Sequence, residues 1–194
     1  MELFYTIQGE GYWQGYAAYF IRLGGCDVGC HWCDVKESWP AEAHPKMSPE
    51  EISSHVYAHK ATIAVVTGGE PLMHTLDPLC DSLRSKNIRT HIETSGAYPI
   101  SGKWDWVCLS PKKFKLPHPD IYALADELKI IVYNQSDFAF AEQQAARVHP
   151  VRCKLYLQPE WSKHAEVMPL IIEYVKKNPQ WGISIQLHKF INVP

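Results

Sequence analysis

Residues 61–71 read ATIAVVTGGEP, an apolar and β-branched run that stops abruptly at two glycines. Such a run, bounded by turn residues, is typical of a buried strand. The stretch RTHIETSG at 89–96 has a similar ending, because its last apolar residue gives way to polar residues and glycine. Strands that end in this way predict a parallel sheet whose polar groups gather at one edge.

Helices are expected between the strands. Ser48 and Glu51 have the spacing of a capping box around Pro49, which predicts a helix from Ser48 to about His59. The other patterns predict helices at about 75–86, 136–147 and 163–178, and strands at 17–25, 104–111, 127–133, 154–160 and 182–190.

Alternating strands and helices favour a parallel sheet with right-handed crossovers. A complete eightfold barrel usually takes about 250 residues, whereas this chain has 194. We therefore expect an α/β fold with an incomplete, TIM-like β/α barrel of about six parallel strands, formed by one domain over residues 1–194. Catalytic groups in such sheets gather at the C-terminal ends of the strands.

The composition limits the class of protein. Apolar residues make up 46% of the chain, charged residues 21%, and the net charge is −2. No apolar stretch approaches the roughly 20 residues of a membrane span, and the N-terminus lacks the features of a signal peptide. We expect a cytoplasmic protein with neither a nucleic acid nor a membrane as its partner.

The segment CDVGCHWC at 26–33 places three of the six cysteines within eight residues. Thiolates bind zinc, copper(I) or iron–sulfur clusters, and a structural zinc site needs four protein ligands. His31 and His44 are candidates for a fourth ligand. A cubane cluster held by three thiolates instead leaves one iron open to a small molecule. The scattered Cys80, Cys108 and Cys153 are expected to be buried core thiols.

The spacing of Cys26, Cys30 and Cys33 after a strand resembles the signature of radical S-adenosylmethionine enzymes. TGGEP at 67–71 resembles their second motif, in which glycines let the backbone approach the methionine amino group. Trp32 matches the aromatic residue that packs near the adenine. The resemblance implies a 4Fe–4S cluster whose open iron binds S-adenosylmethionine and cleaves it to a 5′-deoxyadenosyl radical.

Several polar residues are expected at the same edge of the sheet. Gln8 and Glu10 could read a nitrogen heterocycle, Arg22 could bind a carboxylate, and Glu93 could accept from ring N–H groups. Each alone is more often an ordinary polar or surface residue. Together they indicate a polar heterocyclic substrate that carries a carboxylate.

Nearly the whole chain resembles the 7-carboxy-7-deazaguanine synthase family of queuosine biosynthesis. The motifs that carry the resemblance are FYTIQGEG, FIRLGGC, CDVKESW, TGGEPL, IETSG, LSPK, ELKIIV, LQPE and QLHKFINVP. The family is a group of lyases that convert 6-carboxy-5,6,7,8-tetrahydropterin to 7-carboxy-7-deazaguanine with loss of ammonia. The resemblance implies hydrogen abstraction from the pterin carbon that bears the carboxylate, followed by regeneration of S-adenosylmethionine.

The resemblance also implies which residues form the site. Substrate contacts fall on Ile7, Gln8, Gly9, Glu10, Arg22, Thr67, Glu93, His188 and the C-terminal Pro194. Cofactor contacts fall on Trp32, Cys33, Asp34, Gly69, Ser110, Pro111, Lys112, Gln158, Pro159, Glu160 and Trp161. The cluster ligands are Cys26, Cys30 and Cys33.

One position departs from the family pattern. Members commonly have threonine after Cys33-Asp34, and its hydroxyl ligates a magnesium ion, whereas this chain has Val35. Valine offers no oxygen to a hard cation, so we expect weak magnesium dependence. A flavodoxin or ferredoxin as electron donor and a homodimer are further expectations from the family.

Two other functions stay open on the sequence. A small radical activase would share the cluster and act on a glycine of a partner protein. A non-catalytic zinc or iron–sulfur module would carry metal without catalysis. An activase needs a broad exposed site in place of the Gln8, Glu10, Arg22 and Glu93 set.

Overall fold

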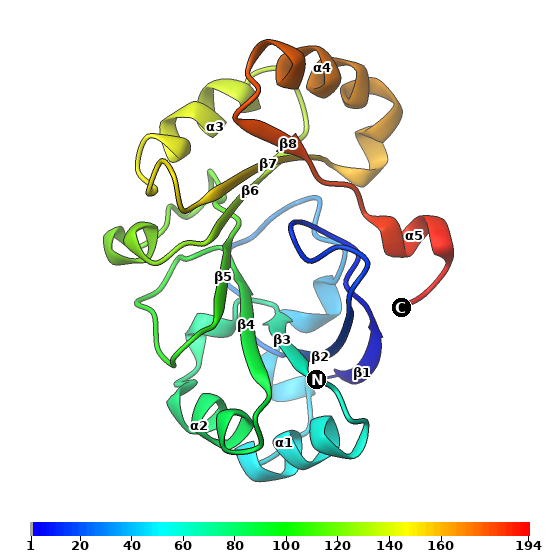
Figure 1. Cartoon of the computed structure of the whole chain (residues 1–194), viewed down its shortest axis with the longest axis vertical. Coiled ribbons are helices and arrows are strands. Elements are labelled where there is room, and N and C mark those ends of the chain that lie inside the picture. The colour runs from blue at the N-terminus through cyan, green and yellow to red at the C-terminus, as the bar shows by residue number, and fades with distance from the viewer. Residues whose placement is uncertain (1) are drawn as a thin grey trace.

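The computed structural model describes residues 2–194 and contains one open, eight-stranded sheet. The strands lie in sequence order, and all neighbours are parallel except β1 and β2, which are antiparallel. Figure 1 shows the sheet curving around a central space, with helices on its outer side. The strands are β1 (Glu2–Ile7), β2 (Ala17–Leu23), β3 (Ile63–Gly68), β4 (Arg89–Thr94), β5 (Trp106–Leu109), β6 (Glu127–Val132), β7 (Lys154–Pro159) and β8 (Trp181–Ile183).

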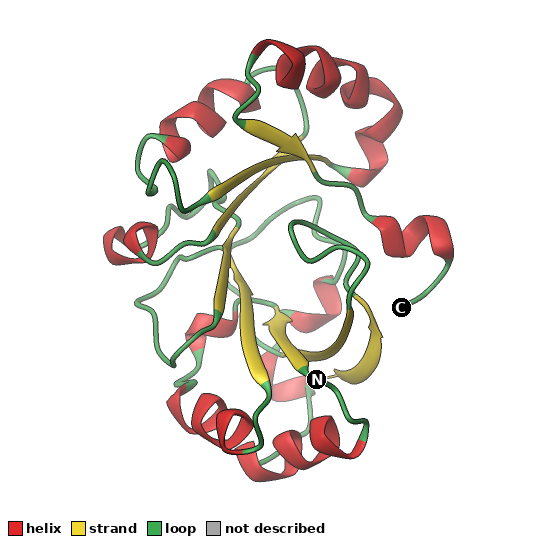
Figure 2. Ribbon diagram, viewed as in Figure 1, coloured by secondary structure: helices red, strands yellow, loops and turns green. Residues whose placement is uncertain are grey.

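Most crossovers contain helices of unequal length (Figure 2), whereas residues 95–105, between β4 and β5, form none. The α-helices are α1 (Pro49–Ala58), α2 (Asp77–Ser85), α3 (Asp137–Ala145), α4 (His164–Lys177) and α5 (Leu187–Ile191). The 3₁₀ helices are η1 (Lys36–Ser38), η2 (Ala41–Ala43), η3 (Pro71–Met73), η4 (Pro119–Ala123) and η5 (Trp161–Lys163). The predicted capping box is present, because the Glu51 N–H donates to Ser48 Oγ and the Ser48 N–H donates to the Glu51 carboxylate. None of the helices among residues 2–194 is long and apolar enough to cross a membrane.

The incomplete barrel predicted from the sequence is confirmed, with two corrections to its elements. The segment before the first predicted strand, at 17–25, forms a further strand, the edge strand β1. The last strand, predicted at 182–190, is present but much shorter, since β8 ends at Ile183 and α5 follows. The chain leaves the sheet there because the N–H of Leu187 donates to the carbonyl oxygen of Gly9 (2.8 Å) instead of to β7.

The two faces of the sheet differ in character. On β6, Leu128, Ile130 and Val132 face outward into the main apolar core, where the helices cover them. Glu127 and Lys129 alternate with them, are 2% and 3% exposed, and face the inside of the barrel. Alternation along a strand thus separates an apolar outer core from a polar interior.

Residues 8–16, which connect β1 to β2, reach the other edge of the sheet. The N–H of Gly11 donates to Ser184 Oγ (2.9 Å), just beyond β8. The hydroxyl of Thr6 donates to the carbonyl oxygen of Pro194 (3.2 Å), so the C-terminus lies beside β1 (Figure 1). These contacts bring the two ends of the chain to the open side of the barrel.

Candidate active site

Two adjoining compartments occupy the carboxyl ends of the strands. The first, here called the cysteine compartment, has a volume of about 260 Å³ and is lined by Cys26, Cys30 and Cys33. The second, here called the Arg22 compartment, has a volume of about 230 Å³. Six residues line both compartments: Glu10, Asp34, Thr67, Gly68, Glu93 and Gln186.

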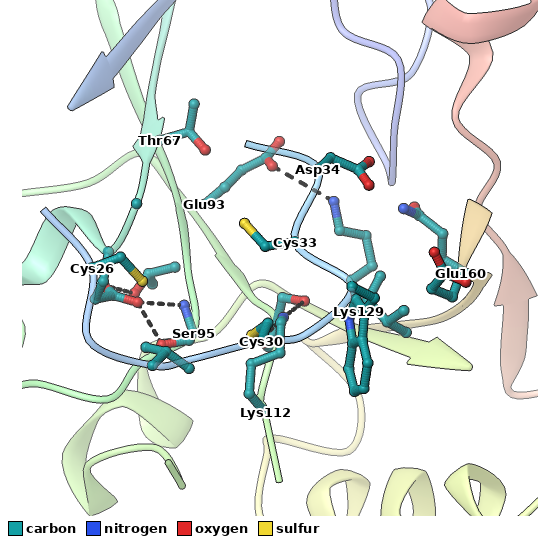
Figure 3. Close-up of a pocket in the computed structure, with 18 of the residues that line it drawn as sticks. Cys26, Cys30, Cys33, Asp34, Thr67, Glu93, Ser95, Lys112, Lys129 and Glu160 are labelled. Atoms are coloured by element: carbon teal, nitrogen blue, oxygen red, sulfur yellow. Dashed lines mark hydrogen bonds and ion pairs between the residues drawn. The ribbon is translucent and has the colours of Figure 1, made fainter. Parts of the chain in front are cut away.

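The cysteines lie on a loop that follows β2 (Figure 3). The N–H of Cys33 donates to the carbonyl oxygen of Cys30 (3.1 Å), and the N–H of Cys26 donates to that of Trp39 (3.2 Å). All three thiols are free and partly buried, and burial raises the pKa of Cys26 and of Cys30. Three unpaired thiols that line one cavity fit a cluster in which each thiolate binds a different iron.

A single-ion site is not formed by these residues. No three His, Cys, Asp or Glu side chains among residues 2–194 are arranged to hold one metal ion. His44 Nε2 is hydrogen-bonded to the carbonyl oxygen of Glu37 (2.8 Å), and the His31 ring packs edge-on against Trp32. Neither histidine therefore completes a four-ligand zinc site. The other three cysteines are buried, as the sequence predicts.

The glycines after β3 form a cradle against the cysteine loop. Gly68 has a φ of +134°, and a Cβ on Gly69 would lie 2.2 Å from the carbonyl oxygen of Gly25 and 2.8 Å from Cys26 Cβ. Only glycine allows the two backbones to approach so closely. This exposes main-chain polar groups beside the thiols, where a ligand of the cluster would sit.

Glu70 fastens this cradle to the next strand. Its side chain is 1% exposed and accepts from the N–H groups of Leu72 (3.0 Å) and Ser95 (2.8 Å) and from the hydroxyls of Thr94 and Ser95. A carboxylate buried away from water is stable only when hydrogen-bond donors satisfy its oxygens, as they do here. The glutamate of TGGEP is thus a structural tie between β3 and β4.

Ten of the eleven cofactor residues implied by the family line the cysteine compartment. Pro111 is buried and does not line it. Lys112 Nζ donates to the carbonyl oxygen (2.5 Å) and the hydroxyl (2.7 Å) of Ser110, and burial lowers its pKa. The Trp32 ring stacks on Tyr133 with centroids 5.7 Å apart. The carboxylate of Glu160 caps η5 by accepting from Ser162 and Lys163.

All nine substrate residues implied by the family line the Arg22 compartment: Ile7, Gln8, Gly9, Glu10, Arg22, Thr67, Glu93, His188 and Pro194. Arg22 is not free there, because Nη1 pairs with Glu2 Oε2 (2.6 Å) and the guanidinium lies over the Phe4 ring. Burial lowers the pKa of His188, which favours its neutral form.

The chain is similar to known proteins over its whole length. A model of the Radical SAM superfamily matches residues 20–109. The chain is 57% identical over 194 residues to 7-carboxy-7-deazaguanine synthase of Flavobacterium psychrophilum, covering 100% of this chain and 91% of the relative. It is 48% identical over 192 residues to the Synechocystis sp. protein of the same name, covering 99% and 91%. The chain belongs to the 7-carboxy-7-deazaguanine synthase family.

A solved structure of this family has the same fold. The crystal structure of QueE from Escherichia coli matches with a TM-score of 0.84 and 32% identity, covering 96% of this chain and 92% of that chain. The family, the radical S-adenosylmethionine enzyme class and the function in queuosine biosynthesis that the sequence predicts are therefore confirmed.

The family's magnesium site does not fit the residues of this chain. Asp34 and Val35 line the Arg22 compartment, and Val35 presents only methyl groups. Asp34 Oδ2 already accepts from Lys189 Nζ (2.9 Å) and from Gln186 Nε2 (3.1 Å). A hard cation requires oxygen ligands. Val35 supplies none, and the neighbouring Asp34 carboxylate is engaged by one ammonium and one amide.

Sequence reasoning missed three residues that line the two compartments: Lys129, Gln186 and Lys189. Gln186 and Lys189 fall in the predicted strand at 182–190, whereas in the structure both lie beyond the end of β8. Lys129 had a visible signal, because ELKIIV places two charged residues at alternate positions of an otherwise apolar strand. Alternation at period two indicates that both face the barrel interior.

Proposed function

We propose that this chain converts 6-carboxy-5,6,7,8-tetrahydropterin to 7-carboxy-7-deazaguanine with loss of ammonia, and that its two compartments divide the task. The cysteine compartment would hold the cluster and S-adenosylmethionine, and the Arg22 compartment would hold the pterin. The observation that carries this proposal is their common wall, which Glu10, Thr67 and Glu93 share. Two ligands on either side of that wall would be adjacent.

The cysteine compartment fits its two ligands. Cys26, Cys30 and Cys33 would hold the 4Fe–4S cluster, which supplies the electron that cleaves S-adenosylmethionine to a 5′-deoxyadenosyl radical. The open backbone at Gly69 would bind the methionine amino group, and Trp32 would pack beside the adenine. These residues would bind the two ligands and orient them toward each other.

The Arg22 compartment fits a carboxylated heterocycle. Glu10 and Glu93 present carboxylate oxygens, which accept hydrogen bonds from the amino and ring N–H groups of a pterin. Arg22 retains N–H donors beyond the one that Glu2 takes, and these would bind the substrate carboxylate. Pro194 lines the same compartment and would lie beside the heterocycle.

Other features of this reaction are proposed on the family pattern. We propose that turnover depends only weakly on magnesium, because Val35 supplies no ligand and Asp34 is engaged by Lys189 and Gln186. We also propose a flavodoxin or ferredoxin as the electron donor, a homodimeric assembly and a cytoplasmic location.

The reaction is tested directly. Anaerobically reconstituted protein is incubated with the carboxy-tetrahydropterin, S-adenosylmethionine and a reductant, and the deazapurine and ammonia are measured by mass spectrometry and enzymatic assay. Cys30→Ala should abolish turnover, because two thiolates do not hold the cubane. Cys80→Ala, which removes a buried thiol outside both compartments, is the matched control and should retain it. Absence of product with the intact protein, or its formation by Cys30→Ala, would contradict the proposal.

A further inference from the structure

Lys129 is a buried ammonium at the centre of the barrel that neither the family pattern nor the sequence motifs assign. Its side chain is 3% exposed and rises from β6 into the cavity (Figure 3). It contacts Glu10 Oε2 and lies 3.6 Å from Glu93 Oε2. Both of these carboxylates line the Arg22 compartment, and Lys129 lines the cysteine compartment behind them.

The two carboxylates are held in the same way. One oxygen of each faces Lys129, and the other accepts from an amide side chain. Gln186 Nε2 donates to Glu10 Oε1 (3.0 Å), and Gln8 Nε2 donates to Glu93 Oε1 (2.7 Å). The Glu10 N–H in turn donates to Gln8 Oε1 (3.0 Å), which connects the two halves. The Lys129 ammonium and the two amide N–H₂ groups all face carboxylate oxygens, which supports carboxylates that carry no proton.

We propose that Lys129 is a positioning residue, which keeps Glu10 and Glu93 both ionised and turned so that the pair presents only hydrogen-bond acceptors to the substrate. The inference rests on the proposed function in taking a pterin as that substrate. A pterin edge with adjacent amino and ring N–H groups carries donors, so a wall of acceptors selects it. A protonated carboxyl in that wall would set donor against donor and weaken binding.

Electrostatics support this role. Burial alone would raise the pKa of Glu10, but the Lys129 charge holds it down at about 2. Burial would likewise lower the pKa of Lys129, yet Glu10 and Glu93 hold it well above the usual lysine value. Two neighbouring carboxylates without a cation between them tend to share one proton. The other titratable groups that act on this pair or on Lys129 are Cys108, Lys112, Glu127 and His188.

The decisive test asks where a proton resides, and it needs no substrate. Infrared spectra at pH 7 are compared for the intact protein, Lys129→Met and Lys129→Arg. Lys129→Met should gain a carboxylic acid C=O band that disappears when Glu10→Gln is added, whereas Lys129→Arg should not gain it. A Glu127→Gln background removes the contribution of that buried carboxyl, whose pKa burial raises. A Lys129→Met protein without the new band would overturn the proposal.

Measurements of ligand binding distinguish a positioning role of Lys129 from a general loss of structure in the variant. In the anaerobic, reconstituted protein, Lys129→Met should raise the dissociation constant for the carboxy-tetrahydropterin by about tenfold or more, measured by thermal shift. The spectral response to S-adenosylmethionine should be unchanged, and Lys129→Arg should restore pterin binding. Lys154→Met, on an exposed lysine of β7, is the matched control.

The outcomes distinguish the inference from the function it rests on. Unchanged pterin affinity in Lys129→Met, or equal losses for Lys129→Met and Lys129→Arg, would overturn the positioning role while leaving the reaction intact. If the intact protein binds no pterin, the proposed function fails, and the infrared comparison still decides the protonation of the pair. Should Lys129→Met not fold, Lys129→Met/Glu10→Gln removes both charges and should recover folding.

Discussion

Gly9 packs directly against His188, so that a Cβ at position 9 would lie 2.1 Å from His188 Nδ1. The two residues lie at opposite ends of the chain, and the hydrogen bond from the Leu187 N–H to the Gly9 carbonyl oxygen fixes them together. This contact joins the loop after β1 to α5 and completes the wall of the Arg22 compartment. The pterin site that we propose therefore depends on a missing side chain.

The first prediction concerns that contact. Gly9→Ala should push His188 aside and raise the Michaelis constant for the pterin by about tenfold, since overpacking costs about 1–3 kcal/mol. Gly15→Ala is the control, because a Cβ there meets open space. Its positive φ makes some loss of stability expected, but not a loss of pterin affinity. Steady-state kinetics at saturating S-adenosylmethionine measures the Michaelis constant of both variants. If Gly9→Ala has the same Michaelis constant as the intact protein, His188 is not part of the pterin site.

The second prediction tests Arg22. Arg22→Ala should weaken pterin binding by about tenfold to a hundredfold, the range for loss of a charged hydrogen bond of about 1.5–3 kcal/mol. The affinity for S-adenosylmethionine should change little. Arg84→Ala, which breaks an exposed pair with Asp105 outside both compartments, should alter neither. Equal losses for both ligands in Arg22→Ala would place Arg22 outside the substrate site.

The third prediction concerns stability. Glu70→Gln should lower the free energy of unfolding by about 1–3 kcal/mol, because an amide N–H₂ would face the donors that the buried carboxylate now satisfies. Urea denaturation of the metal-free protein measures it. Glu50→Gln, on the exposed side of α1, is the control. It should change the free energy of unfolding by at most a few tenths of the change that Glu70→Gln causes. Similar midpoints for the two variants would show that Glu70 is not the tie between β3 and β4.

The fourth prediction is a pH dependence of stability. His91 is 3% exposed, and its burial lowers its pKa to about 4 from the usual 6.5. Below pH 6.5 the unfolded chain gains a proton at this residue while the folded protein does not, so stability falls as the pH drops toward 4. The linkage is worth about 3 kcal/mol over that window. Denaturant titrations at several pH values give the free energy of unfolding as a function of pH. His91→Leu should flatten this pH dependence, and the exposed His55→Gln should not. A slope that His91→Leu leaves unaltered would refute the assignment.

The fifth prediction concerns magnesium. Adding magnesium to metal-stripped, reconstituted protein should change the turnover rate by less than about twofold, because Val35 offers no oxygen ligand. Val35→Thr restores a hydroxyl and should introduce a larger response, measured over the same magnesium titration. A strong rate gain in the unmodified protein would contradict the expectation and imply that waters and substrate oxygens hold the ion.

The sequence by itself predicted the family, the open parallel sheet and the three cysteines that the family pattern assigns to a cluster. Local spacing is enough for these, because three thiols on one loop and glycines at a strand end act over a few residues. The alternation of strands and helices likewise predicts a parallel sheet without knowledge of distant contacts. The capping box at Ser48 and Glu51 is a local signal of the same kind.

Only the tertiary structure decided how the site is closed. The strand expected at 182–190 gives way to α5, since Leu187 finds its acceptor on Gly9, far away in the sequence. Lys129 becomes a central ammonium only when Glu10, at one end of the chain, and Glu93, on another strand, meet it in the barrel. Burial and charge set these roles. Both arise from residues that are far apart in the sequence, so the residues next to Leu187 and Lys129 do not predict them.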